Sequence, residues 1–425
     1  MKQALNHYDV FPRVVPVGRE VTVTIHPKAA HAALSDPQYF LTILPLTESI
    51  ENYGEAYPTL TLVPQGGDLV FHYTFRKEQE YYLRAAPWPG GGQPVLFELS
   101  VYAVGDDLFA RRPYRLDLHV HSCYSDGREC PEFVAAQYRK AGFDGLALTD
   151  HERYYPSRLL QEYYADVSID LALYAGEEVH APGNHIHLVN FGGDFSVNER
   201  YQEQPQAYEE AARSLGEGLA EAAPAERFEY GSCRWVCDRI REGGGLAIFA
   251  HPHWLANVYH VRDRMTARLL RDGVADAFEL IGGQSLAENE MQVAFYEDCL
   301  AQGLRIPVVG SSDAHTTIDA PHFTHMMTLA FAPSLARDDV TAAIREGYSL
   351  AATHYPGEGV HLHGPYRLAS YGRFLLDNYF PHHDDLCFEE GLQMLAHVAG
   401  DPEAREALCR LSGRTEAYRQ RCFGG

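Results

Sequence analysis

The segment RLDLHVHSCYSDG, residues 115–127, begins with alternating polar and apolar side chains and ends in a Ser-Asp-Gly turn. The alternation predicts a short strand, whose successive side chains point to opposite faces. His119 and His121 therefore project to the same face and can bind one metal ion, and Asp126 adds a carboxylate just beyond the strand. The segment predicts a metal site at the carboxyl end of a strand.

Histidine is the residue type that departs most from ordinary composition. The chain has 425 residues and 22 histidines, where average usage would give roughly ten. They occur in short clusters at the ends of apolar segments, as a metal site assembled from several strands requires.

Charge and cysteine content narrow the class of protein. The net charge of −23 disfavours a general nucleic-acid binder, and we expect no long nucleic acid as partner. The eight cysteines form no CxxC pair. No charged-then-apolar signal follows Met1, and no apolar segment reaches membrane-spanning length. These features predict a reduced, cytoplasmic protein without a membrane partner.

The first 112 residues predict a small antiparallel β-sandwich. Residues 20–103 contain six short segments of strand character, separated by stretches rich in proline and glycine. We find no chemical constellation among them. The expected boundary is Arg111-Arg112-Pro113, so that residues 1–112 form the first domain.

From Tyr114 onward, strands alternate with helices, and polar residues concentrate where strands end. Helices are expected at 131–141, roughly 205–222, 232–243 and about 286–302. This order is typical of a parallel α/β barrel, which collects catalytic groups at the carboxyl ends of its strands. We expect the barrel over residues 113–355 and a helical extension over 356–425.

Six motifs, HVHSCYSDG, LTDHE, GEEVH, HIHLVNF, AHPH and SSDAH, follow one another between residues 114 and 355. In this order they resemble the PHP (polymerase-and-histidinol-phosphatase) family of metallohydrolases. The resemblance implies a distorted (β/α)7 barrel with two or three divalent metal ions and, most often, phosphoesterase activity. Zinc, manganese or iron suits imidazole and carboxylate donors. A sandwich before the barrel resembles the carbaryl-hydrolase-like branch.

The resemblance also implies the ligands. The first ion would take His119, His121, a bridging Glu178 and Asp313; the second would take Glu178, His187 and His251; the third would take Asp126, His151 and His315. Two choices stay open within this set. His185 competes with His187 on what we expect to be one strand face, in a motif where Asn190 replaces the usual glycine. Glu177 competes with Glu178, but it should point to the opposite face, so its loss should be mild.

Three further residues are candidates for catalytic roles beside Glu178 and Asp313. Asp150 is expected to orient a ligand histidine rather than bind metal, and a turn cap is the alternative. Arg153 could contact a phosphate or lie on the surface. His253 could donate a proton to a leaving group or pack beside Trp254.

The expected function is a metal-dependent phosphoesterase that acts on a small phosphorylated molecule through a metal-bound hydroxide. The alternative within enzymes is hydrolysis of an amide, carbamate or ester by the same centre. A non-catalytic binding module would lack ligands, whereas this chain retains the full set. The oligomeric state is not predicted.

Overall fold

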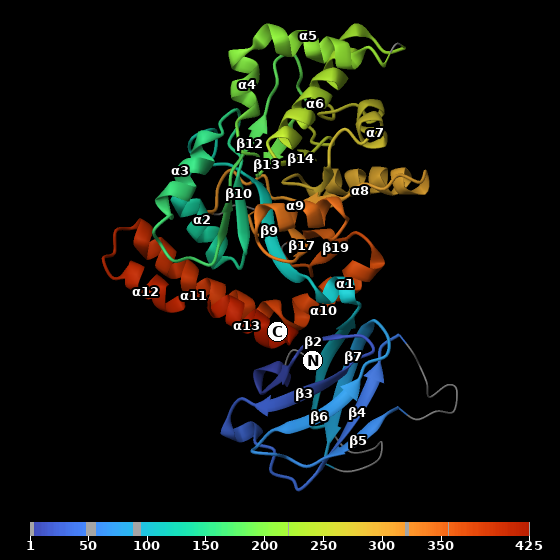
Figure 1. Ribbon diagram of the computed structural model, residues 1–425, viewed down its shortest axis with the longest axis vertical. Coiled ribbons are helices and arrows are strands. Elements are labelled where there is room, and N and C mark those ends of the chain that lie inside the picture. Colours follow the sequence, from blue (N-terminus) through green and yellow to red (C-terminus); the bar gives the residue numbers. More distant parts are fainter. Residues whose placement is uncertain are drawn as a thin grey trace. The chain divides into compact units, whose positions relative to one another are not determined.

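The computed structural model describes residues 4–47, 57–87, 95–219, 221–318, 323–355 and 357–424. The chain folds into two compact units, each with elements labelled in Figure 1. The first unit contains residues 1–112, 369–385 and 413–425; the second contains residues 113–368 and 386–412. The division into domains at 112 and 355 remains a prediction.

Two sheets build the first unit. The first has the order β1-β3-β6 and the second β2-β8-β7-β4-β5. All neighbours are antiparallel except β2 and β8. The strands are β1 (Tyr8–Phe11), β2 (Val14–Pro16), β3 (Glu20–Pro27), β4 (Tyr39–Pro45), β5 (Thr59–Leu62), β6 (Leu69–Thr74), β7 (Gln79–Ala86) and β8 (Phe97–Val104).

Alternate residues of these strands are buried, as the period of two predicted. Ile25 and Phe71 of one sheet and Leu41 and Leu83 of the other belong to the same apolar core. The six strands expected between residues 20 and 103 are all present.

Two larger sheets form the body of the second unit, in the orders β11-β10-β9-β17-β18-β19 and β12-β13-β14-β15-β16. Apolar residues of both sheets share one core, which includes Leu116, Ala147, Ile248 and Val309. The strands are β9 (Arg112–Val120), β10 (Gly145–Leu148), β11 (Ala172–Tyr174), β12 (Gly176–Val179), β13 (Leu188–Phe191), β14 (Leu246–Phe249), β15 (Ala277–Ile281), β16 (Val308–Gly310), β17 (Met326–Ala332), β18 (Ser349–Thr353) and β19 (His361–His363).

The fold is mixed α/β, and its strands are not all parallel. β9, β10 and β11 are parallel, as are β14, β15 and β16. β12, β13 and β14 are antiparallel, and so are β17, β18 and β19. Only residues 180–187 connect β12 to β13, and parallel strands need a crossover of about a dozen residues or more. Such a short connection therefore forces an antiparallel pair.

Helices occupy the expected segments, and the C-terminal part of the chain is helical. Pro131 begins its helix at a position where a missing N–H costs nothing. The helices are α1 (Asp106–Phe109), α2 (Pro131–Lys140), α3 (Tyr155–Tyr163), α4 (Val197–Glu203), α5 (Pro205–Gly216), α6 (Pro224–Glu242), α7 (Asp263–Arg271), α8 (Leu286–Ala301), α9 (Arg337–Arg345), α10 (Tyr366–Asn378), α11 (Phe380–Val398), α12 (Ala404–Leu411) and α13 (Arg414–Phe423).

The part of α11 from Leu386 onward and α12 lie beside α2 in the second unit (Figure 1). The fully buried guanidinium of Arg139 in α2 pairs with Glu390 of α11 at 2.6 Å. No helix within the described residues is both long and apolar enough to cross a bilayer. None of the eight cysteines, all of which lie in the described residues, forms a disulfide.

Candidate metal centre

The ends of five strands bring the predicted ligands together. β9 ends one residue before His121, β10 two before Asp150, and β16 three before Asp313. β12 contains Glu178, and β14 ends two residues before His251. The candidate residues therefore meet at one edge of the two sheets.

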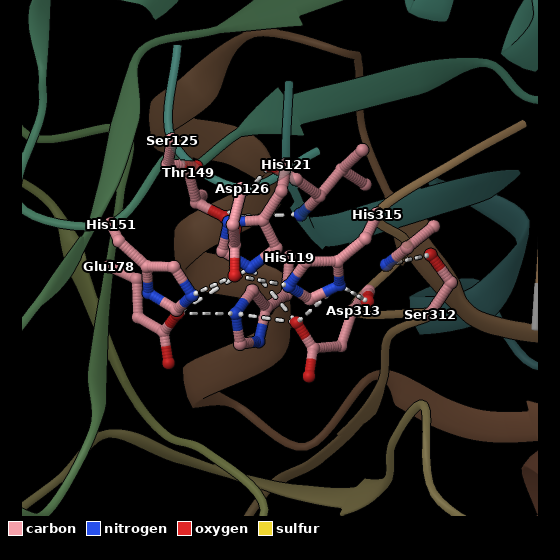
Figure 2. A network of polar contacts seen from close by, with 12 residues as sticks. His119, His121, Ser125, Asp126, Thr149, His151, Glu178, Ser312, Asp313 and His315 are labelled. Carbon is pink, nitrogen blue, oxygen red and sulfur yellow. Dashed lines mark hydrogen bonds and ion pairs between the residues drawn. The ribbon is translucent and has the colours of Figure 1, made fainter. Parts of the chain in front are cut away.

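The first group consists of His119, His121, Glu178 and Asp313 (Figure 2). Nε2 of His119 lies 3.2 Å from Oε2 of Glu178 and 3.4 Å from Oδ1 of Asp313. Nε2 of His121 lies 2.9 Å from the same oxygen of Asp313. The side chains of the two histidines and Glu178 are fully buried. As predicted from the alternation in β9, both histidines face one point.

Several buried donor atoms in this group lack a hydrogen-bond partner. Nε2 of His119, Nδ1 of His121 and Oε2 of Glu178 make no well-aligned hydrogen bond within the described part of the chain, although Oε2 of Glu178 lies 2.7 Å from Nδ1 of His151. Unsatisfied polar atoms at this depth are costly, and a cation bound among them would remove the cost. The donor set of imidazole and carboxylate therefore fits a divalent transition-metal ion.

The electrostatics of the first group are those of strongly coupled charges. Burial alone would raise the pKa of Glu178, but His119 and His187 hold it well below its usual range. Burial alone would lower the pKa of His119, but Asp313, Glu178 and Glu279 raise it well above its usual value. In the metal-free protein these carboxylates favour a protonated His119.

The second group consists of Glu178, His187 and His251. Oε1 of Glu178 lies 2.8 Å from Nδ1 of His187 and 3.3 Å from Nε2 of His251. The two oxygens of Glu178 thus face different histidines, as a bridging ligand requires. His185 instead lies 3.4 Å from Glu229 and is about half exposed. The geometry favours His187, although both histidines precede β13 rather than lying on one strand face as expected.

The third group consists of Asp126, His151 and His315. Oδ2 of Asp126 lies 3.4 Å from Nε2 of His151 and 3.2 Å from Nε2 of His315. The His121 ring stacks on both other rings, with centroid distances of 4.3 and 4.4 Å. His121 therefore borders the first and third groups, one nitrogen toward each.

Two of the candidate ligands have unusual backbone conformations. His251 has a φ of 27° and Asp313 a φ of 49°. Residues other than glycine rarely adopt positive φ, and such strain collects at functional sites.

Sequence reasoning missed Glu279, which lies in β15. Its Oε2 is 2.9 Å from Nδ1 of His119, and both side chains are fully buried. A carboxylate in the apolar segment ADAFELIGG was the available signal. The contact fixes which nitrogen of His119 faces the group.

His180 and His260 were also missed. Nε2 of His180 lies 3.0 Å from Nδ1 of His151, and its ring stacks on His187 at 3.9 Å. The His260 ring lies 4.4 Å from that of His187 on another side. His180 follows directly after GEEV and could have been noticed there, whereas His260 lies in a loop without strand periodicity.

Glu177 has a structural role that the sequence did not suggest. It points away from the histidines, as expected, but its side chain is fully buried. It accepts hydrogen bonds from Ser196, Asn198 and the backbone of Val197 at the start of α4. Asn190, which replaces the expected glycine, donates to it at 3.2 Å. Loss of Glu177 should therefore lower the stability of the fold, and a mild effect stays a prediction for metal binding alone.

Asp150 and Arg153, two of the remaining candidates for catalysis, make contacts other than those expected. Asp150 accepts hydrogen bonds from Ser122 and Ser125, so it holds a turn rather than a histidine. Arg153 donates to the carbonyl of Tyr124.

His253 lies outside the groups of close donor atoms found in the described residues. Its ring packs against Tyr259 and Phe295, with centroid distances of 5.2 and 5.1 Å. The expected neighbour Trp254 lies beside His251 instead, at 6.0 Å. These contacts favour packing over proton donation for His253.

Comparisons with known proteins agree with the motif order. Residues 117–219 match the model of the PHP domain family. The chain is 29% identical over 209 residues to an error-prone DNA polymerase of Mycolicibacterium paratuberculosis. The match includes 45% of this chain and only 16% of the polymerase.

The solved structures that resemble this chain have lower sequence identity to it. One is a two-domain protein from Bacteroides vulgatus that contains a predicted PHP-like metal-dependent phosphoesterase. It is 17% identical, with a TM-score of 0.41, over 58% of this chain and 66% of that one. A predicted metal-dependent phosphoesterase from Bifidobacterium adolescentis is 17% identical, with a TM-score of 0.35, over 62% and 96% of the two chains.

Proposed function

We propose that this PHP-domain protein is a metal-dependent hydrolase, and specifically a phosphoesterase that acts on a small phosphorylated molecule. One observation carries the proposal: Nε2 of His119 and Oε2 of Glu178, both buried and without a well-aligned hydrogen bond, converge at 3.2 Å. We further propose a (β/α)7-type barrel for the second unit and a β-sandwich for residues 1–112.

Ligands are assigned by proximity. His119, His121, Glu178 and Asp313 would hold the first ion, and the second and third groups would each hold one more. Zinc, manganese and iron all suit this donor set. When bound, the ions supply a Lewis acid and hydroxide at neutral pH.

The chain's own residues contribute position and charge. Glu178 joins two groups through its two oxygens, and Glu279 fixes the orientation of His119. Asp126, whose side chain is about half exposed, opens the third group toward solvent. Substrate would therefore approach from the side of Asp126 and His315.

A second candidate, hydrolysis of an amide, carbamate or ester, is favoured by one observation. The guanidinium of Arg153, the basic side chain beside a ligand motif, donates to the Tyr124 carbonyl. A phosphate would have to compete for this donor, whereas an uncharged ester or carbamate needs no such partner.

Two measurements test the proposal. Metal content per chain is determined after reconstitution with zinc, manganese or iron, and we expect two or three ions. The loaded protein is then assayed with 4-nitrophenyl phosphate, bis(4-nitrophenyl) phosphate and 4-nitrophenyl acetate. Turnover of a phosphate ester supports the phosphoesterase, and turnover of the acetate alone supports the second candidate. A chain that binds fewer than one ion contradicts both.

A further inference from the structure

The loop after β14 approaches the second group through His260. The ligand atoms of His187, His251 and His260 lie within 4.8 Å of one another. The ring centroid of His260 is 4.4 Å from that of His187 and 5.6 Å from that of His251. Three imidazoles thus surround one point that Glu178 also faces.

One ring nitrogen of His260 makes no hydrogen bond within the described residues. Its Nε2 is buried and lacks a hydrogen-bond partner, as does Nδ1 of His251, whereas Nδ1 of His187 lies 2.8 Å from Oε1 of Glu178. A buried imidazole nitrogen without a partner is costly, and a cation shared with the nearby ligand atoms of His187 and His251 would remove this cost. The ordinary alternative, a histidine that packs in the core, would leave this nitrogen bonded or exposed.

The loop itself is built so that His260 returns to the centre. The N–H groups of Trp254, His260 and Val261 donate to carbonyls within the loop, at 3.1, 2.8 and 2.9 Å. Leu255 pairs with Tyr259 in an antiparallel bridge. This small hairpin connects His251 to His260 while exposing four apolar side chains: Trp254, Leu255, Val258 and Tyr259.

We propose that His260 is a further ligand of the ion held by Glu178, His187 and His251, and that this ion fastens loop 252–261 to the metal centre. The inference rests on the proposed metal centre and adds a residue that the PHP motifs do not contain. Four protein donors are the usual complement of a zinc ion with a structural role. The second ion therefore orders the apolar loop beside the site.

The test follows metal binding and loop order, not turnover. Hydrogen exchange of loop 252–261 is measured in metal-free and zinc-loaded protein, for wild type, His260→Ala and His185→Ala. Zinc affinities are measured by competition with a chromogenic chelator. His185 is the matched control, because its ring lies 5.7 Å from His260 but pairs with Glu229.

In wild type and His185→Ala, zinc should slow exchange in the loop. In His260→Ala this protection should be lost and one ion should bind at least about tenfold more weakly, while exchange near Asp126 stays slowed. If His260→Ala binds zinc as tightly as wild type and zinc still slows exchange in its loop, the inference is overturned and the proposed function stays intact. No zinc binding by wild type would overturn both.

Chemical modification supplies a test that needs no variant. Diethyl pyrocarbonate modifies unbound imidazole nitrogens, and mass spectrometry locates the products. Zinc should protect His260 and leave His185 reactive. Equal modification of His260 with and without zinc would overturn the inference, even if His260→Ala fails to fold.

Discussion

Nδ1 of His119 lies 2.9 Å from Oε2 of Glu279, across 160 residues of sequence. Both side chains are fully buried. The contact occupies the nitrogen that faces away from Glu178 and Asp313, so Nε2 is the nitrogen that remains for a metal ion. A carboxylate in this position also makes the imidazole a stronger donor.

Loss of Glu279 should weaken metal binding without removing a ligand. We expect Glu279→Ala to lower the affinity of the first ion by about 10–100-fold. Competition with a chelator measures this change. Glu290→Ala, on the exposed side of α8, is the control and should bind as wild type. Unchanged affinity in Glu279→Ala would show that the contact does not tune His119.

Glu178 and Glu177 are adjacent, but their substitution by alanine should have different effects. Glu178→Ala removes a carboxylate that faces both the first and the second group, so at least two ions should be lost. Glu177→Ala leaves the donors around α4 unpaired and should lower stability by roughly 3 kcal/mol, while the folded fraction keeps its metals. Denaturant unfolding and metal analysis of both variants separate these effects. Metal loss in Glu177→Ala alone would reverse the assignment.

Removal of metal should lower thermal stability and any hydrolytic activity together. Ligands that bind only the folded state stabilise it, by about 2.7 kcal/mol at one hundred times the dissociation constant. A chelator should therefore lower Tm, and added zinc should restore it, as calorimetry can show. An unchanged Tm after verified removal would count against a buried centre.

The sequence predicted the parts of the site that follow from strand periodicity. His119 and His121 share a face because strand side chains alternate, and His151, His251 and Asp313 lie close together because they follow strand ends. Short connections between strands were harder to interpret. Residues 180–187 were not recognised as a hairpin connection, so His185 and His187 were expected on a strand.

The residues missed were those whose neighbours are set by the tertiary fold rather than by a local sequence pattern. Glu279 resembled an ordinary strand carboxylate until the sheet brought it beside His119. His260 lies in a loop whose course depends on hydrogen bonds between backbone groups, which leave no pattern in the sequence. Asp150 was expected beside a histidine, because nothing in TDHE reveals the serines of a distant turn.

Metal uptake should depend on pH in a direction set by His119. Burial lowers the pKa of this imidazole, but Asp313, Glu178 and Glu279 raise it well above its usual value. Because the pKa of His119 is higher in the folded state than in the unfolded state, its protonation stabilises the metal-free fold at pH values below the pKa of the unfolded state. This stabilisation is lost as the pH rises through the pKa of the folded state. At neutral pH a metal ion must therefore displace a proton. Calorimetric titrations in buffers of different ionisation enthalpy should show proton release and weaker binding as pH falls; no buffer dependence would contradict this.

Asp150 should control the third group through the turn that carries Asp126. Its carboxylate accepts from the N–H and hydroxyl of Ser122, both at 2.8 Å, and from those of Ser125 at 3.1 and 2.6 Å. Asp150→Ala leaves these donors without their acceptor, so the turn should loosen and stability should fall by about 2–3 kcal/mol.

The expected result for Asp150→Ala is loss of the third ion with the first retained, because His119, Glu178 and Asp313 do not depend on this turn. Asp126→Ala is the matched comparison: it removes the ligand itself from a half-exposed position and should lose the same ion with a smaller fall in Tm than Asp150→Ala. Asp150→Asn keeps one acceptor oxygen and should lie between the two. Mass spectrometry of the intact loaded proteins counts the ions. A full complement of ions in Asp150→Ala would mean that the turn holds Asp126 in place without this carboxylate.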